Sequence, residues 1–143
     1  MQSRRQAREW VVQILFQLDF NPTDLQSTLD TFWPEPAPDD KNRAFTRELV
    51  EGVLKHRTAI DTLIQTHAEN WDLDRMGAVE RNALRLGIYE MKFRKDIPPV
   101  VTINEAVSTV KALADDNAGR FVNGILDRFR KTLSRPARTV DPE

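Results

Sequence analysis

The sequence contains no cysteine and only five glycines in 143 residues. Without cysteine there can be no disulfide and no metal site built on thiolates. The scarcity of glycine and of long β-branched alternations favours helices over sheets. No apolar run approaches the ~18 residues of a membrane-spanning helix, and the N-terminus lacks the apolar core of a signal peptide. We therefore expect a soluble, cytoplasmic protein with no membrane partner.

Familiar catalytic and nucleotide-binding motifs are also missing. Neither G-x-x-x-x-G-K-[ST] nor G-x-G-x-x-G occurs, and there is no G-x-S-x-G or H-E-x-x-H. The only histidines, His56 and His67, are eleven residues apart without an accompanying carboxylate cluster, which does not suit a metal site. Glu105 could serve as a catalytic acid, but a capping role explains it without further chemistry. We expect no enzymatic activity, no cofactor and no metal.

Apolar residues recur at three- and four-residue spacing through most of the chain, which is typical of amphipathic helices. The clearest example lies in residues 96–130, where two such stripes are separated by a polar break at residues 115–119. Pro98-Pro99 precede the first stripe, so we expect that helix to begin after them. The pattern predicts an all-α fold.

Residue types that cap helices mark the expected helix starts. Three pairs have capping-box spacing, namely Ser3 with Gln6, Thr23 with Gln26, and Thr102 with Glu105. Single caps are expected at Asp39 or Asp40, at Thr58 with Asp61, and at Asn117 before the last helix.

The expected helix at residues 75–94 is apolar on most of its sides, so we place it at the centre of the fold. Glu80 and Glu90 fall within its apolar sector. A buried carboxylate needs a partner. Two roles are therefore open for this pair: one pairs with an arginine inside the fold, and the other faces a protein partner.

Both ends of the chain are basic although the net charge is only −1. Residues 1–8 hold three arginines and no acid, and residues 120–138 hold six basic residues against Asp127 alone. If the two ends meet in the fold, they form one basic face. The alternative is that they are solvated helix ends.

A line of residues on the first helix suggests nucleic-acid binding. At ~100° per residue, Arg5, Arg8 and Phe16 fall along one stripe of that helix. Guanidinium groups that hold phosphates beside a ring that stacks a base are typical of single-stranded RNA binding. The alternative is that Phe16 packs under a second pair of helices.

The chain from Arg4 to about Leu133 resembles the NusB family of bacterial transcription antitermination factors. The resemblance rests on the order and spacing of several motifs, among them Arg4-Arg5-x-Ala7-Arg8-Glu9, Asp74-Arg75-Met76-Gly77, Ile103-Asn104-Glu105-Ala106 and Phe121-Val122-Asn123-Gly124. It implies about seven helices in two small helical bundles that share a central helix. The bundles would span about 1–70 and 71–134 of a single domain, followed by a flexible tail at 135–143.

The resemblance also implies a non-enzymatic role in transcription regulation. A member of this family would bind boxA-type single-stranded RNA of ribosomal RNA transcripts together with NusE, a ribosomal small-subunit protein. It would act within the RNA polymerase antitermination complex. Some family members form homodimers, so the monomer and the homodimer are both open. The alternative function is a helical protein-interaction module that does not bind RNA.

The resemblance assigns two surfaces to this chain. The RNA surface would comprise Arg4, Arg5, Arg8, Phe16, Asn117, Arg120 and Phe121. The protein-partner surface would comprise Asp74, Glu80, Arg81 and Leu84. Two positions depart from the family, which often has Tyr in place of Phe16 and Asp-Ser in place of Asn117-Ala118. We expect Phe16→Ala and Arg8→Ala to weaken RNA binding without unfolding the protein.

Overall fold

The computed structural model describes residues 4–133, which contain seven α-helices and one short 3-10 turn but no strand. The helices are α1 (Arg4–Phe20), α2 (Leu25–Phe32), α3 (Asp40–Lys55), α4 (Arg57–His67), α5 (Ala78–Phe93), α6 (Pro99–Leu113) and α7 (Asp116–Arg130), with the turn η1 (Leu73–Arg75) before α5. The all-α prediction is confirmed. The predicted cap at Ser3 and the tail at 135–143 lie outside the described residues.

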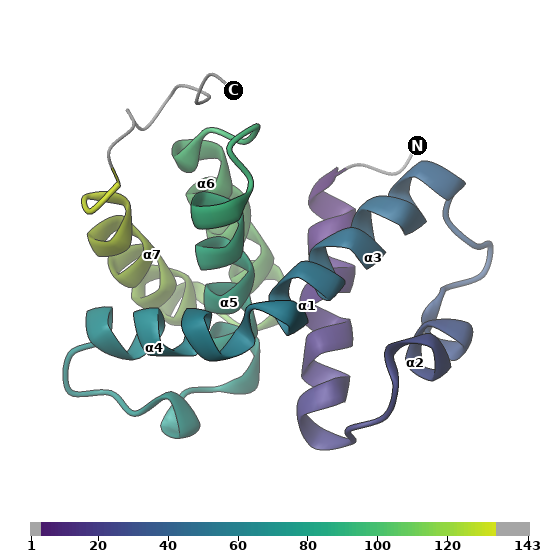
Figure 1. The fold of residues 1–143 in the computed structure, drawn as a ribbon, viewed down its shortest axis with the longest axis horizontal. Coiled ribbons are helices and arrows are strands. Elements are labelled where there is room, and N and C mark those ends of the chain that lie inside the picture. The colour runs from purple at the N-terminus through teal and green to yellow at the C-terminus, as the bar shows by residue number, and fades with distance from the viewer. Residues whose placement is uncertain (1–3, 134–143) are drawn as a thin grey trace.

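The helix α5 is the centre of the arrangement, as its apolar sequence predicts. It contacts α1 and α3 on one side and α4, α6 and α7 on the other (Figure 1). The predicted boundary between two bundles near residue 70 stays a prediction. Because α4 packs mainly on α5 and α7 and only slightly on α3, the contacts favour a boundary nearer residue 56.

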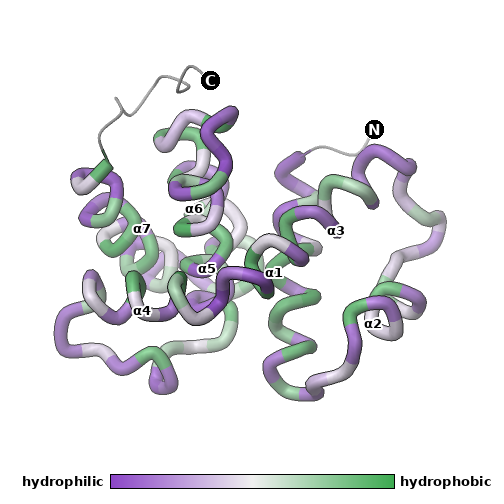
Figure 2. The backbone as a smooth tube through the Cα atoms, in the orientation of Figure 1, coloured by the Kyte–Doolittle hydropathy of each residue, from purple (hydrophilic) through white to green (hydrophobic). Residues whose placement is uncertain are grey.

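The core forms where the apolar stripes of these helices meet around α5. Polar and apolar positions alternate along the helices in Figure 2, as amphipathic packing requires. A close approach between α5 and α7 occurs at Gly87, where an added β-carbon would lie 2.9 Å from Leu126 Cδ1. The missing side chain therefore lets α5 and α7 pack directly. No helix among residues 4–133 combines the length and apolar character needed to cross a membrane.

Aspartates, rather than the predicted Thr23 and Asn117, cap the helices α2 and α7. Asp24 accepts a hydrogen bond from the Ser27 amide at 2.9 Å at the start of α2, so Thr23 is not the cap. Asp115 accepts from the Ala118 amide at 2.7 Å and caps α7 in place of Asn117. Asp39 caps α3 through the Asn42 amide at 2.8 Å, which confirms one of the two predicted positions.

Two other predicted helix starts are wrong. The helix α6 begins at Pro99, three residues before Thr102, because proline fits the first turn, where its missing N–H is not needed. The helix α4 begins at Arg57 directly after α3, without a side-chain cap from Thr58 or any other residue of its first turn. In both cases the chain enters the helix earlier than the polar residue that resembles a cap.

A buried ion pair joins α1 to α5. Arg8 donates to both carboxylate oxygens of Glu90, at 2.8 and 2.9 Å, and their side chains are 6% and 1% exposed. The Thr102 hydroxyl of α6 donates to the same carboxylate at 3.0 Å. Glu90 is thus the carboxylate that pairs inside the fold, and Thr102 serves this network rather than a helix start.

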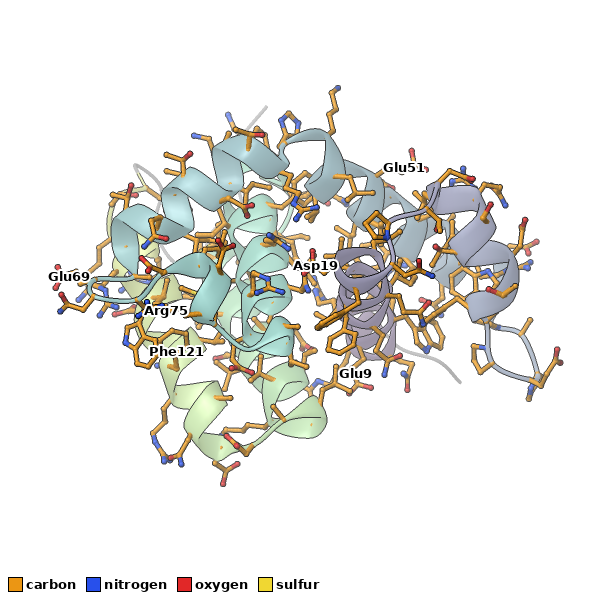
Figure 3. The ribbon with its side chains drawn as sticks, turned by 90° about the horizontal axis from the view of Figure 1, so that it is seen from below. Glu9, Asp19, Glu51, Glu69, Arg75 and Phe121 are labelled. Carbon is orange, nitrogen blue, oxygen red and sulfur yellow. The ribbon has the colours of Figure 1, made fainter. Side chains whose placement is uncertain are left out.

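A second polar cluster joins the C-terminal end of α1 to α4 and α5. The Asp19 carboxylate, labelled in Figure 3, accepts from Arg81, Asn82 and Arg85 of α5 at 2.9–3.1 Å. Arg57 of α4 donates to the same carboxylate at 3.3 Å. Burial by itself would raise the pKa of Asp19, but the hydrogen bond from Asn82 and the charges of Arg85 and Arg81 outweigh burial and hold this pKa below its usual value. The carboxylate therefore stays ionised while it holds the three helices together.

Candidate nucleic-acid interface

The three arginines near the start of α1 face different surroundings. Arg5 is exposed and forms a two-point ion pair with Glu105 of α6, at 2.9 and 3.2 Å. Arg4 is also exposed, but it lies against the ring of Phe45 on α3. Arg8 is buried with Glu90. Only Arg5 therefore combines an exposed guanidinium with the side of α1 that carries Phe16.

The placement of Arg8 corrects the predicted RNA surface. Its guanidinium is buried and donates to both carboxylate oxygens of Glu90. Arg8 therefore cannot reach a phosphate without breaking its ion pair with Glu90. The buried pair leads us to expect that Arg8→Ala destabilises the fold, in contrast to the expectation from the sequence. The helical spacing that aligns Arg8 with Phe16 is too coarse to show that α5 covers the arginine.

Phe16 lies at the edge of a shallow apolar hollow. Its side chain is 38% exposed, and its ring packs against Phe20 with a centroid separation of 4.9 Å. The hollow has a volume of about 400 Å³ and is lined by Val12, Gln13, Phe16, Gln17, Phe32, Val79 and Leu113. Sequence reasoning missed the two glutamines, which lie one residue after Val12 and Phe16 and line the same hollow.

A second hollow lies at the start of α7. It has a volume of about 450 Å³ and includes Trp71, Arg75, Glu80, Asn117 and Phe121. The Trp71 and Phe121 rings meet edge to face, 5.5 Å apart. Figure 3 shows Arg75 and Phe121 close together on this edge of the molecule. Trp71 is 52% exposed. Sequence reasoning did not identify Trp71 as a site residue, because its exposure cannot be read from the sequence.

Neighbouring residues join the two hollows into one surface. Val79 lines the first hollow and Glu80 the second, and these are consecutive residues of α5. At the end of α6, Leu113 lines the first hollow and the next residue, Ala114, lines the second. The fold therefore brings the Phe16 region of α1 and the start of α7 together, although about a hundred residues separate them in sequence. We call this combined area the Phe16–Phe121 surface.

Arg120 extends this surface near the start of α7. It is exposed and donates a hydrogen bond to the Asn117 side-chain oxygen. The Asn117 amide therefore helps to orient Arg120 and does not cap the helix. Arg75 lines the second hollow, and Arg5 and Arg120 are exposed on α1 and α7, which border the two hollows. Arg5 is paired with Glu105 and Arg75 with Asp72, in each case at the surface. Among residues 4–133, no group of His, Asp and Glu side chains is arranged to hold a metal ion.

The overall sequence places this architecture in a known family. A sequence model of the NusB family matches residues 5–131. The chain belongs to the NusB family. The transcription antitermination protein NusB of Myxococcus xanthus is 44% identical over 140 residues, which cover 95% of this chain and 100% of that protein.

Solved structures of NusB share the fold. The T. maritima NusB structure superposes with a TM-score of 0.84 at 40% identity, covering 94% of each chain. A chain from a crystal structure of the antitermination factors NusB and NusE in complex with dsRNA gives a TM-score of 0.83 at 32% identity, covering 91% of this chain and 97% of that one.

The residues that the NusB resemblance assigns to a protein partner separate into two groups. Asp74 is exposed in η1, and Glu80 is half-buried with its carboxylate against Gly77. Arg81 is held by Asp19 and by the carbonyls of Leu73 and Met76. Leu84 is completely buried, so no partner can touch it without opening the core. We therefore remove Leu84 from the partner surface.

Proposed function

We propose that this NusB-family protein is a transcription antitermination adaptor that binds boxA-type single-stranded RNA of ribosomal RNA transcripts together with NusE. The observation that carries the proposal is the Phe16–Phe121 surface, which joins two hollows with exposed aromatic rings. Family membership supports it, as does the similarity to a NusB chain solved with NusE and dsRNA, which supports RNA and NusE as partners but not the choice of a single strand. The role is non-enzymatic and belongs in the cytoplasm, where the elongating RNA polymerase complex would recruit the protein.

The chemistry of the surface suits unpaired bases. The exposed rings of Phe16 and Trp71 offer flat faces on which bases stack, and each such contact contributes about 1–3 kcal/mol. Gln13, Gln17 and Asn117 carry amides that both donate and accept hydrogen bonds, which suits the edges of splayed bases. A duplex hides these faces and edges, so the surface favours a single strand.

Only a few cations border this surface. Arg5, Arg75 and Arg120 are exposed there, while Arg8 is withdrawn into the core. Each phosphate contact of a single strand contributes roughly −0.7 to the slope of log affinity against log salt concentration. Three contacts give weak, salt-sensitive binding, so a helper protein such as NusE has a physical role in the complex.

A titration of labelled boxA-type RNA tests the proposal. Binding would be followed by fluorescence anisotropy with and without NusE at two salt concentrations, and a duplex of the same sequence would serve as the control. We expect single-strand binding that tightens with NusE and weakens with salt by a slope of about −2 for three contacts.

The outcome separates the proposal from its alternative. If NusE binds but single-stranded RNA never does, the chain is a protein-interaction module and the Phe16–Phe121 surface has another use. Equal affinity for duplex and single strand would overturn the stacking argument while leaving phosphate contacts in place.

A further inference from the structure

A third hollow lies on a different side of α1. It has a volume of about 450 Å³ and is bordered by α1, α3 and the segment that follows α5. Its charged residues are Arg4, Arg8, Lys41, Glu48, Arg94 and Asp96, and the ring of Phe45 lies among them. Basic side chains from three separate segments therefore converge on one site.

Most of these charges are already paired. Arg8 is neutralised by Glu90, and Arg94 contacts Asp96 at 3.1 Å and Glu48 at 2.9 Å. For the remaining two, Arg4 and Lys41, no carboxylate oxygen of residues 4–133 lies within the 4.0 Å limit of an ion pair. Four cationic side chains thus share three carboxylates, which leaves the hollow with a positive charge.

Contacts with Phe45 and Asn42 hold the Arg4 guanidinium in one orientation. Its guanidinium lies 3.9 Å from the centroid of the Phe45 ring, and its one hydrogen bond to a described residue goes to the Asn42 side chain at 3.5 Å. A guanidinium that stacks on an aromatic ring keeps its N–H groups free around its edge. Arg4 therefore presents a planar set of donors at a hollow that the exposed Lys41 also lines.

This hollow is separate from the Phe16–Phe121 surface. At 100° per residue along α1, Arg5 lies about 20° from Phe16 around the helix axis, whereas Arg4 lies about 120° away. The packing agrees, since Arg4 lies on α3 while Arg5 pairs with α6. Arg4 is consequently better assigned to the third hollow than to the RNA surface that contains Phe16.

We propose that the hollow formed by Arg4, Lys41 and Phe45 is a phosphate-binding site. The edge of the guanidinium matches two oxygens of a phosphate, and the ammonium supplies a point charge to a third. The phosphate comes either from an RNA backbone that continues past the Phe16–Phe121 surface or from a free anion. Only the RNA form of this proposal rests on the proposed function.

Lys41→Gln is the variant that tests the site. Lys41 is exposed, so its replacement removes the charge without disturbing the core. Lys55→Gln is the matched control, because Lys55 is an exposed lysine at the other end of the same helix. Equal thermal midpoints of both variants and the unmodified chain establish that the fold is unchanged.

Inorganic phosphate is the first probe, followed through backbone amide shifts in NMR titrations at constant ionic strength. We expect saturable shifts at Arg4, Lys41 and Phe45 in the unmodified chain and in Lys55→Gln, and about tenfold weaker binding in Lys41→Gln. A boxA-type RNA strand is the second probe. If its backbone is the source, Lys41→Gln reduces the magnitude of the salt slope by about 0.7, and Lys55→Gln does not.

These two probes separate the failure of the site from the failure of the proposed function. Saturable phosphate shifts without any RNA binding would support a free-anion site and overturn only the RNA adaptor. RNA binding that Lys41→Gln and Lys55→Gln affect equally, with no phosphate shifts in the hollow, would overturn the site and leave the adaptor standing.

Discussion

Arg5 and Arg8 are three residues apart on the same helix, and each forms a two-point ion pair with a glutamate. The nitrogen–oxygen distances are almost the same, 2.9 Å and 2.8 Å for the shorter contacts. The surroundings differ, since the Arg5 side chain is 57% exposed and the Arg8 side chain 6%. An exposed pair contributes about 0–1 kcal/mol, while removing one partner of a buried pair costs about 3–5 kcal/mol.

The difference determines what each arginine can do. Water and salt compete with the Arg5–Glu105 pair, so a phosphate can take the place of Glu105 at little cost. No such exchange is open to Arg8, because Glu90 would be left buried and charged. Arg5 is therefore free to bind a ligand, whereas Arg8 has a structural role.

Breaking the buried pair should produce the largest effect. We expect Arg8→Ala to lower the free energy of unfolding by about 3–5 kcal/mol, because Glu90 loses its partner inside the core. Urea unfolding measures the change. The double variant Arg8→Met with Glu90→Leu should recover much of the loss, since it removes both charges, and a double variant no more stable than Arg8→Ala would contradict this account.

The buried Asp19 carboxylate should contribute to stability in a pH-dependent way, unlike an exposed aspartate. The pKa of Asp19 is lower in the folded protein than in the unfolded chain, so its contribution is fully present above the unfolded pKa of about 4 and is lost as pH falls through the folded pKa. Asp19→Asn should therefore destabilise the protein at pH 7 by about 2–3 kcal/mol and much less near pH 2. Thermal unfolding at both pH values measures this, with the exposed Asp30→Asn as the control.

Removing the exposed ring should affect binding and leave stability almost unchanged. Phe16→Ala is expected to weaken single-stranded RNA binding by about 1–3 kcal/mol, because one stacking platform is lost. Phe16→Tyr should bind at least as well as the original chain, and Phe16→Leu, which keeps the apolar bulk, should bind like alanine. Anisotropy titrations at fixed salt would contradict the stacking role if Phe16→Leu bound as well as phenylalanine.

The exposed arginine should give the smallest change in stability. Arg5→Ala is expected to leave the thermal unfolding midpoint almost unchanged, because water screens the exposed ion pair with Glu105. It should also reduce the magnitude of the RNA salt slope by about 0.7, since one phosphate contact disappears. A slope equal to that of the original chain would place Arg5 outside the RNA contact.

The local features of this fold could be predicted from the sequence. Helical periodicity predicted an all-α chain with a central helix near residues 75–94, and α5 spans Ala78–Phe93. Asp39 was one of two expected caps and does cap α3. The buried carboxylates of the central helix also required a partner, and Glu90 has one. These features depend on the order of neighbouring residues, which a helix repeats every few positions.

The partners themselves were decided only by the tertiary structure. Helical spacing aligned Arg8 with Arg5 and Phe16, but Glu90 lies 82 residues away, and its approach buries only one of the two arginines. Trp71 contacts Phe121, and Arg4 lies on Phe45, through contacts that also join residues far apart in the sequence. The sequence by itself determined which faces must be covered, because burial of apolar stripes is a local requirement. Which charges are covered with them depends on how the helices pack, and this packing makes Arg8 structural and leaves Arg5 at the surface.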